Sequence, residues 1–144
     1  REIISHPGGV AILAFTKEHE VLLVKQFRYA IHESILEIPA GRMDQNETHF
    51  DCAIRELKEE TGYISKEVSY LGQMFPTPGY SSEVIHLYLA KNCVYTGQTL
   101  EEGEFLDVIK MSYEDVLNRI QNNEIWDAKT IIALLKYDKL TKTE

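Results

Sequence analysis

The stretch GRMDQNETHFDCAIRELKEETGY, residues 41–63, decides the fold of this chain. Its apolar side chains recur at the i, i+3, i+4 and i+7 positions of a helix that lies on a core. These positions are Phe50, Ala53, Ile54 and Leu57. A glycine in the left-handed conformation commonly ends such a helix, so we expect this one to end at Thr61-Gly62.

The same predicted helix carries three glutamates within five residues, Glu56, Glu59 and Glu60. At about 100° per residue, Glu56 and Glu60 project together beside the apolar face, and Glu59 points roughly 80–100° further from it. Like charges one turn apart repel each other, so the cluster is favourable when a cation lies between the carboxylates. A hard divalent ion with oxygen ligands is the natural candidate. The alternative is a solvated acidic face, the ordinary meaning of a charge run.

The spacing of this stretch resembles the Nudix box. Gly41, Glu47, the Arg55-Glu56-Leu57 triplet, Glu59-Glu60 and Gly62 match its defining positions. Because roughly ten constrained positions agree, we favour this interpretation over a plain acidic surface. The resemblance implies a loop–helix–loop that binds Mg²⁺ or Mn²⁺ and hydrolyses nucleoside diphosphates linked to another group.

Composition favours a single soluble domain over residues 1–144, with 44% hydrophobic and 26% charged residues. No stretch approaches the roughly 18 apolar residues of a membrane span and no signal peptide is visible, so we expect a cytoplasmic protein without a membrane partner. The net charge of −8 argues against a nucleic-acid partner, because phosphate backbones require Lys and Arg. Cys52 and Cys93 show no pairing pattern, which favours free thiols.

The rest of the chain predicts an α/β fold. Strand-forming runs rich in Val, Ile, Leu, Tyr and Phe are Val10–Phe15, Val21–Gln26, Ile35–Ile38, Val68–Phe75, Glu83–Ala90 and Phe105–Met111. Ser112 with Asp115, and then Asp127, are expected to cap two further helices, and residues 136–144 are expected to fray. A mixed β-sheet with helices on both faces is the economical packing. It is also the α/β/α sandwich that the Nudix resemblance implies.

Segments outside the box resemble the ADP-ribose pyrophosphatase subfamily. They are Lys25–Tyr29, Leu36–Gly41, the loop from Phe75 to Glu83, and Trp126–Thr130. From its residues alone, the proline-containing loop either carries binding residues or is a tight connection without a ligand. The resemblance implies that the substrate-binding residues are Arg28, Glu37, Pro78, Gly79 and Glu83. Tyr63 departs from the pattern, because an aliphatic residue often stands there.

The subfamily resemblance implies metal-dependent hydrolysis of the pyrophosphate bond of ADP-ribose to AMP and ribose 5-phosphate. It implies that the metal ligands are Glu56, Glu59, Glu60, the carbonyl of Ala40, and Glu104. Besides Glu56 and Glu60, the catalytic set contains Arg55 and Glu102. We interpret Arg55, together with Glu47, as a residue that orients and partly neutralises the glutamates.

The catalytic base is expected in the acidic loop from Thr99 to Phe105. Taken alone, this loop is either a solvated acidic segment or part of the site. The resemblance makes Glu102 the base, and Glu101 remains the alternative for that role. Gly103 would let the loop swing, as gating loops often do.

Two alternative functions remain open from the sequence. One is a Nudix hydrolase of another nucleotide sugar or dinucleotide, such as GDP-mannose or NADH, and the other is a non-catalytic ADP-ribose sensor on the same fold. Sensors usually have eroded boxes, unlike this one. The resemblance also implies a homodimer. Because the chain starts at Arg1-Glu2, we expect the N-terminal dimerisation segment to be absent before residue 1.

Overall fold

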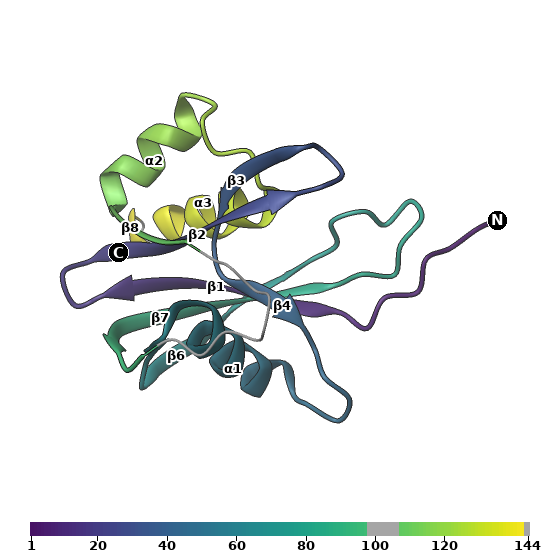
Figure 1. Ribbon diagram of the computed structural model, residues 1–144, viewed down its shortest axis with the longest axis horizontal. Coiled ribbons are helices and arrows are strands. Elements are labelled where there is room, and N and C mark those ends of the chain that lie inside the picture. The colour runs from purple at the N-terminus through teal and green to yellow at the C-terminus, as the bar shows by residue number, and fades with distance from the viewer. Residues whose placement is uncertain (98–106, 143–144) are drawn as a thin grey trace.

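The protein, represented by a computed structural model that describes residues 1–97 and 107–142, consists of a sheet with helices on both sides (Figure 1). The strands are β1 Gly9–Thr16, β2 Glu20–Arg28, β3 Glu33–Glu37, β4 Ala40–Arg42, β5 Tyr63–Ile64, β6 Glu67–Met74, β7 Ile85–Tyr95 and β8 Asp107–Ser112. The helices are α1 His49–Thr61, α2 Tyr113–Gln121 and α3 Ala128–Lys142. The predicted strands and helices are thus confirmed within the described residues, whereas β4 and β5 were too short to predict.

The described strands form one mixed sheet, as predicted. The strand order is β3-β2-β1-β7-β5, and β4, β6 and β8 pair with β1, β7 and β2 respectively. β1 and β7 run parallel, with Gly9 opposite Ile85. The other pairs are antiparallel.

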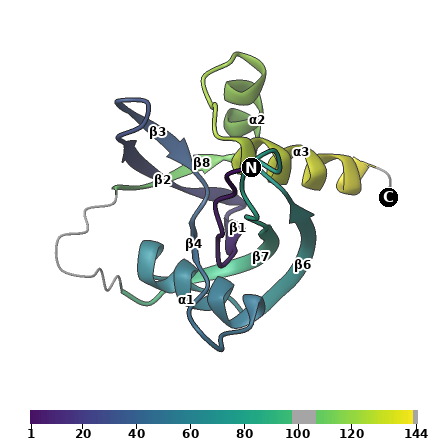
Figure 2. The same cartoon turned by 90° about the vertical axis from the view of Figure 1, so that its right-hand side faces the viewer.

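β1 explains why both faces of the sheet are covered. All eight of its residues are buried, and alternate side chains of a strand point to opposite faces. One set (Val10, Ile12, Ala14) packs with α1, and the other (Ala11, Leu13, Phe15) packs with α2 and α3. Figures 1 and 2 show α1 on one side of the sheet and α2 with α3 on the other. The α/β/α sandwich is therefore confirmed.

The buried face of α1 differs from the predicted stripe. Phe50 and Ile54 are 42% and 36% exposed. The residues buried instead are Cys52, Ala53, Leu57 and Thr61. The helix is turned so that its glutamate edge lies against β4, where the carboxylate of Glu60 accepts a hydrogen bond from the N–H of Ala40. The apolar pattern alone cannot reveal this polar attachment.

The expectation that residues from 136 onward fray is wrong up to Lys142, where α3 ends. Tyr137 is buried, and its ring centroid lies 5.0 Å from that of Phe15. The next residue, Asp138, accepts a 2.6 Å hydrogen bond from the hydroxyl of Tyr113. Tertiary contacts therefore stabilise a polar helix end. Across the described residues, no helix combines the length and apolar character that a membrane crossing requires.

Both cysteines are buried and free, as predicted. They lie in the core cluster beneath α1. Burial raises the pKa of the Cys52 thiol to about 12 and that of Cys93 to about 11. Because a thiol reacts as its thiolate, both side chains serve as packing groups.

Candidate active site

The ends of α1 are fixed by local hydrogen bonds. The Thr48 hydroxyl accepts from the N–H of Asp51 at 3.1 Å, which caps the start of the helix. Gly62 has a φ of 78° and donates its N–H to the carbonyl of Lys58 at 2.8 Å. This is the predicted left-handed glycine end. With both ends defined, the direction in which each glutamate projects is set.

Arg55 is the centre of the acidic cluster. Its Nε and Nη2 bond both carboxylate oxygens of Glu47 at 2.7 and 2.9 Å. Its Nη1 bonds Glu56 at 2.9 Å and Glu59 at 3.0 Å, and Nη2 also reaches the carbonyl of Arg42. One guanidinium therefore orients three carboxylates, which supports the interpretation of Arg55 as an orienting residue.

The carboxylates of Glu56 and Glu60 both lie against β4. A side chain on Gly41 would overlap the carboxyl group of Glu56, so this carboxyl group could not keep its position with another residue beneath it. Glu60 accepts from the N–H of Ala40 at 3.0 Å. Glu56 is 12% exposed, whereas Glu59 is 40% exposed, in agreement with the predicted outward projection of Glu59.

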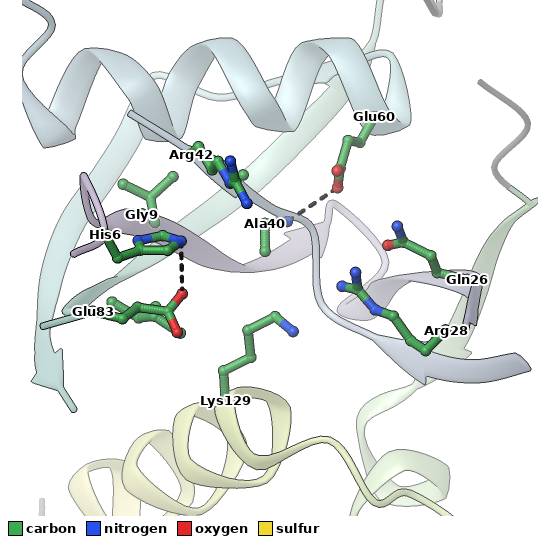
Figure 3. Close-up of a pocket in the computed structure, with 12 residues that line it drawn as sticks. His6, Gly9, Gln26, Arg28, Ala40, Arg42, Glu60, Glu83 and Lys129 are labelled. Carbon is green, nitrogen blue, oxygen red and sulfur yellow. Dashed lines mark hydrogen bonds and ion pairs between the residues drawn. The ribbon is translucent and has the colours of Figure 1, made fainter. Parts of the chain in front are cut away.

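A cavity of about 290 Å³ opens beside these glutamates. β1, β2, β4, β7, the last turn of α1 and the first turn of α3 contribute to it. Its lining residues are His6, Gly9, Val10, Gln26, Arg28, Ala40, Gly41, Arg42, Glu60, Glu83, Ile85 and Lys129. Figure 3 shows Arg28 and Lys129 pointing toward the same space that Glu60 and β4 border. The cavity therefore has a cationic wall and an acidic wall.

The cationic wall is built on Glu37. This carboxylate is 1% exposed, accepts two 2.7 Å hydrogen bonds from Arg28 and one of 2.6 Å from Lys129. Burial pushes the pKa of Glu37 upward, but the two cations more than offset it and lower the pKa overall. The hydrogen bond to Glu37 also raises the pKa of Arg28. Glu37 thus lies behind the two cations that face the cavity.

His6 and Glu83 form a third side of the cavity. The Nε2 atom of His6 lies 3.5 Å from the Glu83 carboxylate, and its Nδ1 accepts the N–H of Gly8 at 3.0 Å. Since Nδ1 is an acceptor, the ring proton of the neutral form is on Nε2 and faces Glu83. The carboxylate is thereby held at the rim of the cavity, as Figure 3 shows.

The structure brings together only part of the predicted site. Arg28, Ala40, Glu60 and Glu83 line the cavity, whereas Pro78 and Gly79 do not. Glu56 and Glu59 lie on the adjoining face of α1 through their bonds to Arg55. Glu101, Glu102 and Glu104 lie outside the described residues.

Sequence reasoning missed four polar lining residues, His6, Gln26, Arg42 and Lys129. Lys129 could have been predicted from the sequence, because it lies in Trp126–Thr130, a segment that resembles the subfamily and stands at the start of a predicted helix. Asp127 accepts from Lys129 at 2.9 Å and from the Thr130 hydroxyl at 2.6 Å, so the helix cap also holds the lysine. His6 has no ligand spacing in the sequence, and only the strand pairing brings it beside Glu83.

The oxygen atoms at this site are of the type that binds a hard divalent cation. Carboxylate oxygens of Glu56, Glu59 and Glu60 and a backbone carbonyl at Ala40 are the ligands that Mg²⁺ prefers. Within residues 1–97 and 107–142, no three acidic, His or Cys side chains are placed to hold an ion by themselves. Mg²⁺ usually completes its shell with water and substrate phosphate, so an incomplete protein shell agrees with its chemistry.

The NUDIX domain family model matches residues 5–134. The chain belongs to the Nudix family. Two relatives are each 40% identical over 136 residues, which cover 93% of this chain and 74% of the relative: the ADP-ribose pyrophosphatase of Bacillus subtilis (strain 168) and the methanol dehydrogenase activator of Bacillus methanolicus. The GDP-mannose pyrophosphatase of Escherichia coli (strain K12) is 33% identical, covering 93% of this chain and 75% of that protein.

The fold comparison agrees with the family assignment. A crystal structure of an ADP compounds hydrolase superposes with a TM-score of 0.83 at 20% sequence identity. The match covers 94% of this Nudix chain and 73% of the other. At this identity the superposition supports the architecture of the sheet and its helices.

The Arg55 bond to Glu47 predicts a pH-dependent stability. This bond lowers the pKa of Glu47 from 4.5 to about 2 in the folded protein. The stabilisation is therefore complete above about pH 4.5 and is lost as the pH falls toward 2. Glu47→Gln should lower the free energy of unfolding by on the order of 1–3 kcal/mol at pH 7, and this difference should shrink below pH 4.5.

Urea unfolding of both proteins at several pH values measures this difference. Glu18→Gln, at an exposed turn residue, serves as the matched control and should show no such trend. A difference that stays constant from pH 7 to about 2.5 would contradict the assignment of the stabilising pair.

Proposed function

We propose that this Nudix protein hydrolyses the pyrophosphate bond of ADP-ribose, giving AMP and ribose 5-phosphate, with Mg²⁺ or Mn²⁺ as cofactor. The observation that carries the proposal is the cavity in which Arg28 and Lys129 face Glu60 and β4. A pyrophosphate needs cations on one side and bound metal on the other. The 40% identity to an ADP-ribose pyrophosphatase points to the nucleotide sugar.

The substrate phosphates would bind between these two walls. Arg28 presents a forked guanidinium and Lys129 a compact ammonium, two complementary donors for phosphate oxygens. Glu37 would act on the substrate indirectly, by holding both cations in position from beneath. At the rim, Glu83 supplies a carboxylate that can accept hydrogen bonds from ribose hydroxyls.

The ligands of the metal would be Glu56, Glu59, Glu60, the carbonyl of Ala40, and Glu104. When bound, the ion supplies charge neutralisation at the phosphoryl oxygens and an activated water. Arg55 binds both Glu56 and Glu59 through Nη1 and limits their mutual repulsion. Glu102 would take the proton of the attacking water.

Hydrolysis of GDP-mannose is the second candidate, because a pyrophosphatase of that name is 33% identical over most of this chain. The phosphate-binding walls suit both substrates equally, so they do not choose between the two. Turnover of ADP-ribose, GDP-mannose and NADH with Mg²⁺, measured as kcat/KM on each, tests the assignment. We expect the highest value for ADP-ribose. A higher value for GDP-mannose would replace the proposed substrate, and no turnover of any of them would favour a ligand sensor.

Glu60→Gln should lower kcat on the preferred substrate by more than about tenfold at saturating Mg²⁺, because a primary ligand contributes several kcal/mol of charge stabilisation. The folded protein should persist, since the amide keeps the shape of the side chain and removes one charge from a crowded face. Circular dichroism of the same sample checks the fold. Retention of more than a tenth of kcat would exclude Glu60 as a primary ligand.

Substitutions in the cationic wall should mainly change KM. Lys129→Ala should raise KM by roughly 10- to 100-fold, the usual range for losing a hydrogen bond to a charged group. Glu37→Gln should change KM in the same direction, because Arg28 and Lys129 lose the charge that orients them. Lys139→Ala, an exposed lysine on the same helix, is the control. If KM of the Lys129 variant equals that of the control, the lysine does not bind phosphate.

The catalytic base has its own test. Glu102→Gln should lower kcat by roughly 10²- to 10⁴-fold with little change in KM, the pattern of a lost general base. Glu101→Gln is the matched control at the adjacent position. If only the Glu101 variant shows the loss, the base is Glu101 and the assignment within the loop is displaced by one residue.

The proposal includes a single Nudix domain over residues 1–144 that forms a homodimer in the cytoplasm. Phe27 near the end of β2, and Tyr29 and Ile31 on the connection to β3, support dimerisation, because all three side chains are exposed. Multi-angle light scattering measures the oligomeric state. A monomer at all concentrations would remove the homodimer from the proposal.

A further inference from the structure

A second cavity, of about 300 Å³, lies away from the candidate active site. Its lining includes Lys17, just after β1, Ile64 and Lys66 around the connection from β5 to β6, and Lys91 and Val94 on β7. At about 3.3 Å per residue, β1 separates the Gly9 end that lines the first cavity from Lys17 by roughly 25 Å. The two cavities are therefore separate sites at opposite ends of the same central strands.

Three lysines line this second cavity together with a single carboxylate, that of Glu67. Lys17, Lys66 and Lys91 are all exposed, and none forms an ion pair with a described residue. Glu67 stands opposite Lys91 in the β6–β7 register, but its carboxylate accepts a 2.9 Å hydrogen bond from the amide of Asn92 instead. In a chain of net charge −8, this is a local concentration of positive charge. This positive charge favours binding of an anion, because an anion would relieve the repulsion between the lysines.

The lysines border an apolar surface. Ile64 and Val94 are cross-strand partners of β5 and β7, and both side chains are exposed at this cavity. Two aliphatic side chains beside a cationic rim suit a ligand with both a charged group and a carbon skeleton. A cavity of this volume lies at the lower limit of small-molecule sites.

We propose that this second cavity binds a small organic phosphate, a phosphomonoester. Lys17, Lys66 and Lys91 hold the phosphate, and the carbon skeleton lies on the Ile64–Val94 pair. The site is distinct from the cavity at Glu60 and does not depend on the substrate assigned there. Its failure would leave the proposed hydrolase activity untouched.

Amide chemical-shift mapping by NMR, in EDTA to suppress metal-dependent binding at the first cavity, tests the proposal. Ribose 5-phosphate and AMP are the probes, and sodium sulfate at equal ionic strength is the control. We expect saturable shifts at Ile64, Lys66 and Val94 with a Kd near about 1 mM or below for at least one phosphomonoester. Tighter binding of AMP than of ribose 5-phosphate would identify a nucleotide, and the reverse a sugar phosphate.

The double variant Lys66→Gln/Lys91→Gln should raise that Kd by about tenfold or more, because hydrogen bonds to charged groups are lost. Lys139→Gln removes an exposed lysine of α3 that does not line this cavity and should leave the Kd unchanged. Unchanged thermal unfolding shows that both variants are folded. Absent shifts, equal shifts with sulfate, or an unchanged Kd in the double variant would each overturn the proposal.

Discussion

The close approach of α1 to β4 is the contact on which the rest of the site depends. It is possible because Gly41 has no side chain, so the Glu56 carboxyl group can lie directly on the strand. The N–H of Ala40 binds Glu60 on the same strand. Two carboxylates are thereby brought to the edge of a cavity, although each would be more favourably solvated elsewhere. Arg55 stabilises this arrangement by bonding Glu47, Glu56 and Glu59 at once.

Charge pairing also stabilises the opposite wall of the cavity. Glu37 is almost fully buried, and it would be strongly destabilising there without its three charged hydrogen bonds. Each wall thus uses one buried or half-buried ion of opposite sign to fix the groups that face the cavity. Arg55 orders carboxylates, and Glu37 orders cations. The first set suits a metal and the second a phosphate, which is the combination that pyrophosphate hydrolysis requires.

Most strands, helices and helix ends could be predicted from the sequence, because each depends on a local pattern of residues. The strand runs, the left-handed Gly62 and the caps at Ser112 and Asp127 depend on neighbours within a few residues. The rotation of α1 could not be predicted, since Phe50 and Ile54 match a helical stripe but are exposed in a helix whose Glu60 is bound to β4. The place of His6 in the site could not be predicted either, because its partner Glu83 is distant in sequence and is brought close by the pairing of β1 with β7.

The candidate cavity gathers residues from nearly the whole length of the chain. His6 comes from the beginning, Glu60 from the middle and Lys129 from the last described helix. Gly9 lies opposite Ile85, so a nascent chain that has not yet reached β7 has its acidic helix but no parallel partner for β1. During vectorial synthesis Arg28 and Glu37 therefore emerge before Glu60, and Lys129 emerges last, so a chain cut short before α3 lacks part of the cationic wall. The cavity is therefore complete only after synthesis has reached α3 and the sheet has formed.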